Sequence, residues 1–64
     1  MPKYVFHESY IWEAGDPVDL DNGRRFKTKA RSLERVKLPL NSSVGRNWVL
    51  ISVDGEPVKG VNYR

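Results

Sequence analysis

Basic side chains alternate along one short stretch of the chain, at Arg25, Lys27, Lys29 and Arg31. On a strand, side chains two residues apart share a face, so this spacing predicts a row of cations about 7 Å apart. That interval resembles the distance between successive phosphates along one nucleic-acid strand. Cations placed this way bind phosphates with little choice of base sequence.

The charge of the whole chain supports the same interpretation. Residues 24–37 carry seven cations against Glu34, a net charge of +6, whereas residues 1–23 carry a net charge of −4. A charge concentrated in one segment indicates a partner better than the total of +3 does. We therefore predict nucleic-acid binding, to DNA or RNA, with two aromatic residues available for base stacking. The predicted contacts are Arg24, Lys27, Lys29, Arg31, Arg35, Lys37, Tyr10 and Trp12.

Two other uses of these residues stay open. Lysines on an edge strand also keep that edge from aggregating, and the acidic N-terminal third of the chain can neutralise part of the basic run. The alternative function is a protein-interaction module or a small protein inhibitor, because Trp and Tyr anchor interfaces and a free sheet edge can accept a partner's strand. The same edge would accept a second copy, as a homo-oligomer.

Residue types that carry catalysis or bind metals are scarce. The chain has no cysteine and one histidine, His7, with no partner indicated by spacing. Asp16, Asp19 and Asp21 resemble the start of a calcium-binding loop, but the glycine and distal glutamate of that loop are missing. No glycine-rich phosphate-binding motif occurs. We predict a protein that is not an enzyme and has no catalytic residue, metal or cofactor.

Length and hydropathy indicate one soluble domain, residues 1–64. No apolar run approaches the roughly 20 residues of a membrane span, and the N-terminus lacks the apolar stretch of a signal peptide. Together with the absence of cysteine, this predicts a cytoplasmic protein with no membrane partner.

Alternating aromatic residues predict a strand over residues 4–12. Tyr4, Phe6, Tyr10 and Trp12 would share one face, and Glu8 interrupts that face. We expect Tyr4 and Phe6 in the core. The position of Tyr10 and Trp12, in a core or at an interface, stays open. A turn is predicted over residues 14–17.

A hairpin is predicted over residues 18–28, because Asn22-Gly23 is a strong turn signal. A two-residue loop would pair Leu20 with a charged residue. A three-residue loop, residues 22–24, pairs Leu20 with Phe26 and sets acidic residues opposite basic ones, so we prefer it.

The next segment, residues 24–38, fits a strand, a bend at residues 32–34 and a second strand, with a short helix as the alternative. A polar loop follows over residues 41–47. The most apolar run, residues 48–53, predicts a central strand, and Asp54-Gly55 predicts a tight turn. Pro57 restricts the return strand to an edge.

These patterns predict a mainly β domain of about five strands. It would be a small antiparallel barrel, SH3-like or OB-like, or a curved sheet, with one short helix possible within residues 25–37. A helix there would make the fold a winged-helix variant.

One segment, VGRNWVLISVDGEPVKG at residues 44–60, resembles the wing hairpin of small phage excisionases, which bend DNA. The likeness covers about a quarter of the chain and consists of an aromatic strand followed by a turn with Gly55 and Pro57. The resemblance implies DNA binding by this hairpin. That family places a helix-turn-helix before its wing, whereas the first third of this chain is predicted to be strand.

Overall fold

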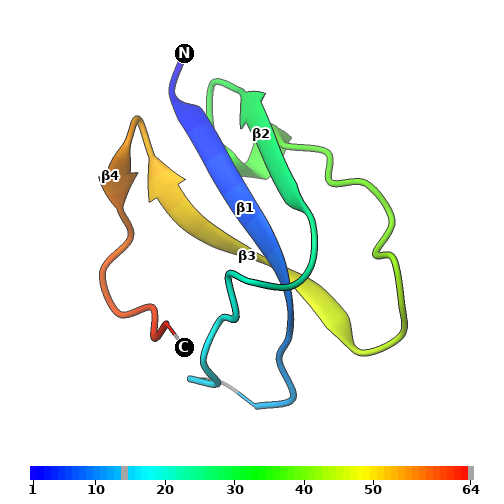
Figure 1. Ribbon diagram of the computed structural model, residues 1–64. Coiled ribbons are helices and arrows are strands. Elements are labelled where there is room, and N and C mark those ends of the chain that lie inside the picture. Colours follow the sequence, from blue (N-terminus) through cyan, green and yellow to red (C-terminus); the bar gives the residue numbers. More distant parts are fainter. Residues whose placement is uncertain (14, 64) are drawn as a thin grey trace.

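One antiparallel sheet organises the part of the chain that the structure describes, residues 1–13 and 15–63 of a computed structural model (Figure 1). The strand order is β2-β1-β3-β4, so β1 and β3 are interior and β2 and β4 form the edges. Figure 1 shows β1 and β3 crossing at a pronounced angle, as expected of a twisted sheet. The elements are β1 (Lys3–Tyr10), β2 (Arg25–Lys29), the 3-10 helix η1 (Leu33–Arg35), β3 (Arg46–Val53) and β4 (Glu56–Pro57).

The predicted mainly β class is confirmed, but the closed barrel is wrong. The sheet has four strands and stays open, because β4 is only two residues long and Pro57 has no N–H to continue the pairing. Among the described residues the only helical element is the three-residue η1, so the winged-helix variant is also wrong.

The predicted pairing of residues 18–21 with β2 is wrong. β2 pairs with β1 instead, and Phe26 lies opposite Phe6. This pairing sets Phe26 beside a buried aromatic residue, whereas Leu20 remains 37% exposed. In the segment before β2, Val18 is 1% exposed and forms a parallel bridge with Tyr63.

The predicted turn at Asp54-Gly55 is confirmed, with Val53 opposite Glu56. Both turn residues have positive φ, 51° and 84°, which is the backbone of the two-residue turns that suit twisted hairpins. The strand before the turn is interior, and the strand after it is an edge, as the apolar run and Pro57 predict.

The core is small. Its buried apolar side chains are Tyr4, Phe6, Val18 and Ile51, so the prediction for Tyr4 and Phe6 is confirmed. Ile51 is an extra residue in β3, since Val5 pairs with Ser52 and Phe6 with Leu50. Such a bulge bends the strand and increases its twist.

A long segment separates β2 from β3. Its predicted strand and bend are confirmed as β2 and η1, but residues 36–40 form no second strand. In Figure 1 this segment, green to yellow, forms an arm beside the sheet. Residues 30–45 therefore lie beside the sheet and add no strand to it.

Candidate nucleic-acid interface

Three cations project from the edge strand β2. Arg25, Lys27 and Lys29 are exposed, while Phe26 and Thr28 between them are half-buried. Lys3, also exposed, lies directly opposite Lys29 on β1. We call these four residues the cationic edge. Alternation along the strands sets all four side chains on the same face of the sheet.

The backbone of β2, which carries three of these four residues, has no partner strand on its outer side within the described chain. The N–H of Glu8 donates to the carbonyl of Arg24 at 2.9 Å, and the N–H of Ala30 donates to that of Pro2 at 3.2 Å. Backbone hydrogen bonds alternate along an antiparallel pair of strands. Because Arg24 and Ala30 bond to the β1 side, the even-numbered residues between them do so as well. The odd-numbered residues, which carry the cations, direct their N–H and C=O groups outward.

No ion pair between described residues involves the cationic edge. The structure records ion pairs only from Glu8, to Arg24 at 3.3 Å and to Arg46 at 3.5 Å. The acidic residues Asp19 and Asp21 do not lie opposite β2, because the predicted hairpin does not form. Four cations that repel one another across two strands create a field that favours an anion.

The eight residues predicted to bind nucleic acid lie in different parts of the structure. Lys27 and Lys29 are in the cationic edge. Arg31 is exposed two residues after Lys29, and Arg35 and Lys37 are exposed at and after η1. Arg24 lies on the opposite face of the sheet with Glu8, and Tyr10 and Trp12 lie near the far end of β1.

The buried carboxylate of Glu8 holds a polar cluster on that opposite face. The side chain is fully buried and accepts hydrogen bonds from the N–H and the hydroxyl of Ser42, both at 2.7 Å. Arg24 adds two longer hydrogen bonds. Burial opposes ionisation, but the hydrogen bonds from Arg24 and Ser42 outweigh it and lower the pKa of Glu8 to about 2. Glu8 is therefore an anion at neutral pH.

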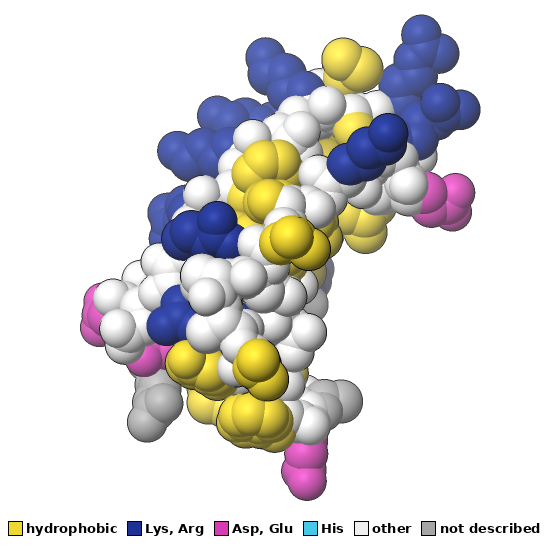
Figure 2. Space-filling view, turned by 90° about the vertical axis from the view of Figure 1, so that its right-hand side faces the viewer, with side chains coloured by type: hydrophobic (Ala, Val, Ile, Leu, Met, Phe, Trp, Pro, Cys, Tyr) yellow, Lys and Arg dark blue, Asp and Glu magenta, His cyan; other side chains and the backbone are white. Residues whose placement is uncertain are grey.

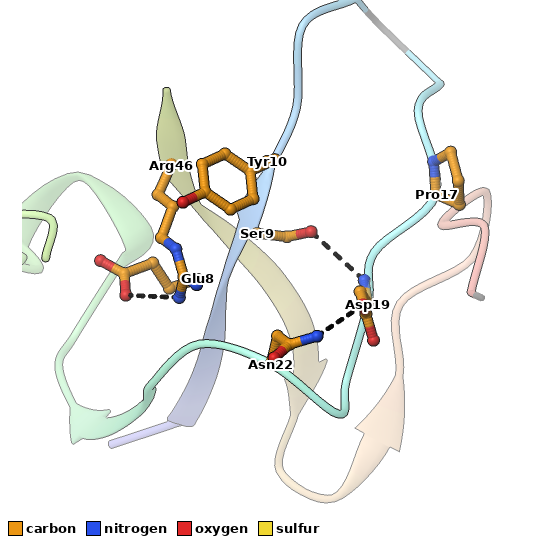
Figure 3. Close-up of a pocket in the computed structure, with 7 residues that line it drawn as sticks. All are labelled: Glu8, Ser9, Tyr10, Pro17, Asp19, Asn22 and Arg46. Atoms are coloured by element: carbon orange, nitrogen blue, oxygen red, sulfur yellow. Dashed lines mark hydrogen bonds and ion pairs between the residues drawn. The ribbon is translucent and has the colours of Figure 1, made fainter. Parts of the chain in front are cut away.

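Aromatic rings cover the two guanidinium groups of the cluster. The guanidinium of Arg24 lies 5.3 Å from the ring of Trp48, and that of Arg46 lies 4.7 Å from the ring of Tyr10. Both distances fit a cation–π interaction. Hydrogen bonds with Ser43 and Arg46 lower the pKa of Tyr10. Figure 3 shows the Arg46 side chain reaching toward Glu8, with the Tyr10 ring beside it.

The cluster fixes residues 38–44, which we call the pinned loop. The indole N–H of Trp48 donates to the carbonyl of Pro39 at 2.8 Å, and Arg24 donates to that of Leu40. Glu8 accepts from Ser42, and the hydroxyl groups of Tyr10 and Ser43 are 3.1 Å apart. The loop is therefore held at four positions within five residues.

The two aromatic residues proposed for base stacking are both exposed. Trp12 is 73% exposed and Tyr10 is 46% exposed. Their rings are stacked, with centroids 6.3 Å apart and planes 16° apart. A β-carbon on Gly45 would lie 2.5 Å from the indole of Trp12, so the indole rests directly on that glycine.

The aromatic pair and the cationic edge are separate sites. Tyr10 and Lys3 are at opposite ends of β1, seven residues or roughly 23 Å apart along the strand. Their side chains also alternate to opposite faces. A single nucleotide therefore cannot contact both Tyr10 and Lys3.

A cavity of about 250 Å³ lies between the end of β1 and residues 17–22 (Figure 3). Its polar groups are largely occupied with one another. The hydroxyl of Ser9 accepts from the N–H of Asp19 at 3.2 Å, and the side chain of Asn22 donates to the Asp19 carboxylate at 3.0 Å. The lining residues are Glu8, Ser9, Tyr10, Pro17, Asp19, Asn22 and Arg46.

The lone histidine is a packing residue. His7 is 3% exposed, and its Nε2 lies 2.6 Å from the carbonyl of Asn22. A carbonyl can only accept, so Nε2 carries the proton. Within the described residues no three acidic or imidazole side chains are grouped to hold a metal ion, and no helix has the length and apolarity to cross a membrane.

Sequence reasoning missed the role of Glu8. The available signal was an acidic residue on the aromatic face of a strand in a chain with excess cations, since a buried carboxylate requires cationic or hydrogen-bonding partners. Those partners are Arg24, Arg46 and Ser42, which come from three separate parts of the chain and meet at Glu8 only in the fold.

Comparisons of the chain with protein-family models, with curated proteins and with solved structures found no match. Its function is therefore inferred from the described site alone.

Proposed function

We propose that this protein binds nucleic acid by contacting backbone phosphates with its cationic edge. One observation carries the proposal: four exposed cations share one face of β1 and β2, and no described acidic side chain forms an ion pair with them. Phosphates are the anions that such a row suits, because their charges recur along a strand.

The proposed mode of binding is electrostatic. The three side chains on β2 lie about 7 Å apart, and Lys3 widens the row toward β1. Arg31 is exposed at the bend two residues after Lys29. Contacts of this kind give affinity with little base preference, so DNA and RNA of any sequence are expected to bind.

The test is a titration of labelled single- and double-stranded DNA and RNA with the full chain. We expect binding that weakens steeply between about 50 and 200 mM salt. The double variant Lys29→Glu/Arg31→Glu is expected to abolish binding. No binding at the lower salt concentration contradicts the proposal.

A matched control separates the cationic edge from the net charge. Lys29→Glu and Lys59→Glu change the charge equally, and both side chains are exposed. Lys59 lies beyond β4, at the other edge of the sheet. We expect Lys29→Glu to weaken binding at least tenfold and Lys59→Glu to change it little. Equal losses would show that the overall charge, not the edge, binds.

A further inference from the structure

Large apolar side chains are exposed along the side of the molecule that carries the pinned loop. On the pinned loop, Val44 is 95% exposed, Leu40 is 91% exposed and Leu38 is 42% exposed. Next to the loop, Tyr10 and Trp12 are exposed as well. We call these five residues the apolar strip. Figure 2 shows hydrophobic side chains along the middle of this side of the molecule.

Two contacts join the pinned loop to the aromatic pair. The indole of Trp12 rests on Gly45, the residue after Val44. The hydroxyl of Tyr10 bonds to that of Ser43, the residue before Val44. The exposed valine therefore lies between two contacts that join the loop to the aromatic rings.

The Leu40 side chain is exposed even though the backbone around it is held in place by hydrogen bonds. Arg24 bonds to the carbonyl of Leu40 itself, and the buried Glu8 binds Ser42 two residues later. With the backbone held against the sheet, the leucine side chain is left in water. A loop fixed in this way loses little conformational entropy when it binds, which favours docking.

Cations flank the apolar strip near Leu40. Half of the Arg24 side chain is exposed beside the leucine whose carbonyl it binds, and Lys37 precedes Leu38 in the chain. Figure 2 shows Lys and Arg side chains on both sides of the hydrophobic ones in the upper part of this face. The carboxylate of Glu8 lies underneath and is fully buried.

We infer that the apolar strip binds a segment of a partner protein that combines apolar side chains with carboxylates. Leucine and valine side chains offer no ring for a base to stack on, so a nucleic acid does not explain them. A second copy would set the same cations against each other in a symmetric contact. A segment with apolar and acidic side chains complements both features, and Trp12 and Tyr10 are residue types that dominate binding energy.

The experiment selects peptides from a random phage-displayed library on the immobilised full chain. We expect selected peptides that combine aromatic or aliphatic residues with Asp or Glu. Leu40→Asp is expected to weaken their binding at least tenfold while leaving oligonucleotide binding unchanged. Circular dichroism should show that this variant stays folded, because the replaced side chain is exposed. Lys59→Glu is the control and should change neither kind of binding.

Three outcomes would overturn the inference. The first is a library that yields no binders, or yields binders insensitive to Leu40→Asp. The second is binding to vesicles of phosphatidylcholine and phosphatidylserine that Leu40→Asp removes, since the strip would then face a membrane. The third is a dimer in light scattering that Leu40→Asp dissociates, since a second copy would then cover the strip.

Discussion

At the scale of single residues, Glu8 organises more of the molecule than any other side chain described. It is a buried anion that binds two guanidinium groups and the backbone of the pinned loop. Removing one partner from such a cluster leaves buried charges uncompensated, which is far costlier than losing a surface ion pair. Glu8 is therefore expected to support stability and the shape of the loop together.

The lowered pKa of Glu8 predicts a loss of stability in acid. The pKa falls from an ordinary value of 4.5 to about 2 in the folded protein. Stability from this group is present above pH 4.5 and is lost as the pH falls through 2, because the unfolded chain takes up the proton first. Urea midpoints measured across this range should fall for the native chain. The difference between the native chain and Glu8→Gln should shrink toward acid pH, and a constant difference would contradict the prediction.

Trp12→Ala tests whether the aromatic pair belongs to the core. Trp12 is mostly exposed and is stacked on Tyr10, so we expect a loss of only about 1 kcal/mol in the free energy of unfolding. Phe6→Ala, at a buried site, is expected to cost about 3–5 kcal/mol. Urea denaturation measures both. A loss at Trp12 as large as that at Phe6 would show that the indole is buried in solution.

At the scale of elements, the hydrophobic pattern predicted strands better than it predicted their partners. The alternation in residues 4–12 and the apolar run in residues 48–53 each led to a real strand. The signal at Asn22-Gly23 led to the wrong partner for β2. Short-range turn signals indicate where the chain bends, whereas pairing depends on which neighbour buries more apolar surface, and β1 offered Phe6.

The glycine at that bend has a role that turn propensity alone did not reveal. Gly23 has φ of +87°, and a β-carbon there would lie close to the carbonyl oxygen of Glu8. The chain therefore passes directly against β1 at the residue that anchors the buried cluster. Only a residue without a side chain fits at this crossing.

Gly23→Ala is expected to destabilise the fold more than Gly55→Ala. Both glycines have positive φ, but nothing lies within 4 Å of a β-carbon built on Gly55. Gly55→Ala therefore lowers the free energy of unfolding only through the strained backbone, by about 1 kcal/mol. Gly23→Ala adds a steric clash with β1 to the same backbone cost. Thermal unfolding compares the two. Equal losses would mean that the close approach at Gly23 does not exist in solution.

At the scale of the whole molecule, the cationic edge is separated from the pinned loop. The cationic edge is on one face of the sheet, and the polar cluster under the pinned loop is on the other. Composition alone indicated a basic segment and spare aromatic residues. Composition could not show that the basic residues and the aromatic pair lie on different faces of the sheet, because that arrangement depends on the pairing of β2 with β1. The alternation of cations in residues 25–29 was evident in the sequence, whereas the face that they share with Lys3 was not.

The most direct test of phosphate binding by the cationic edge is the salt dependence of oligonucleotide affinity. Four phosphate contacts predict a slope of log K against log salt of about −3 to −4. Lys27→Ala should reduce the size of that slope by about 1, and Lys59→Ala should leave it unchanged. The result that would contradict the account is a slope near zero, or an equal change from both lysine variants.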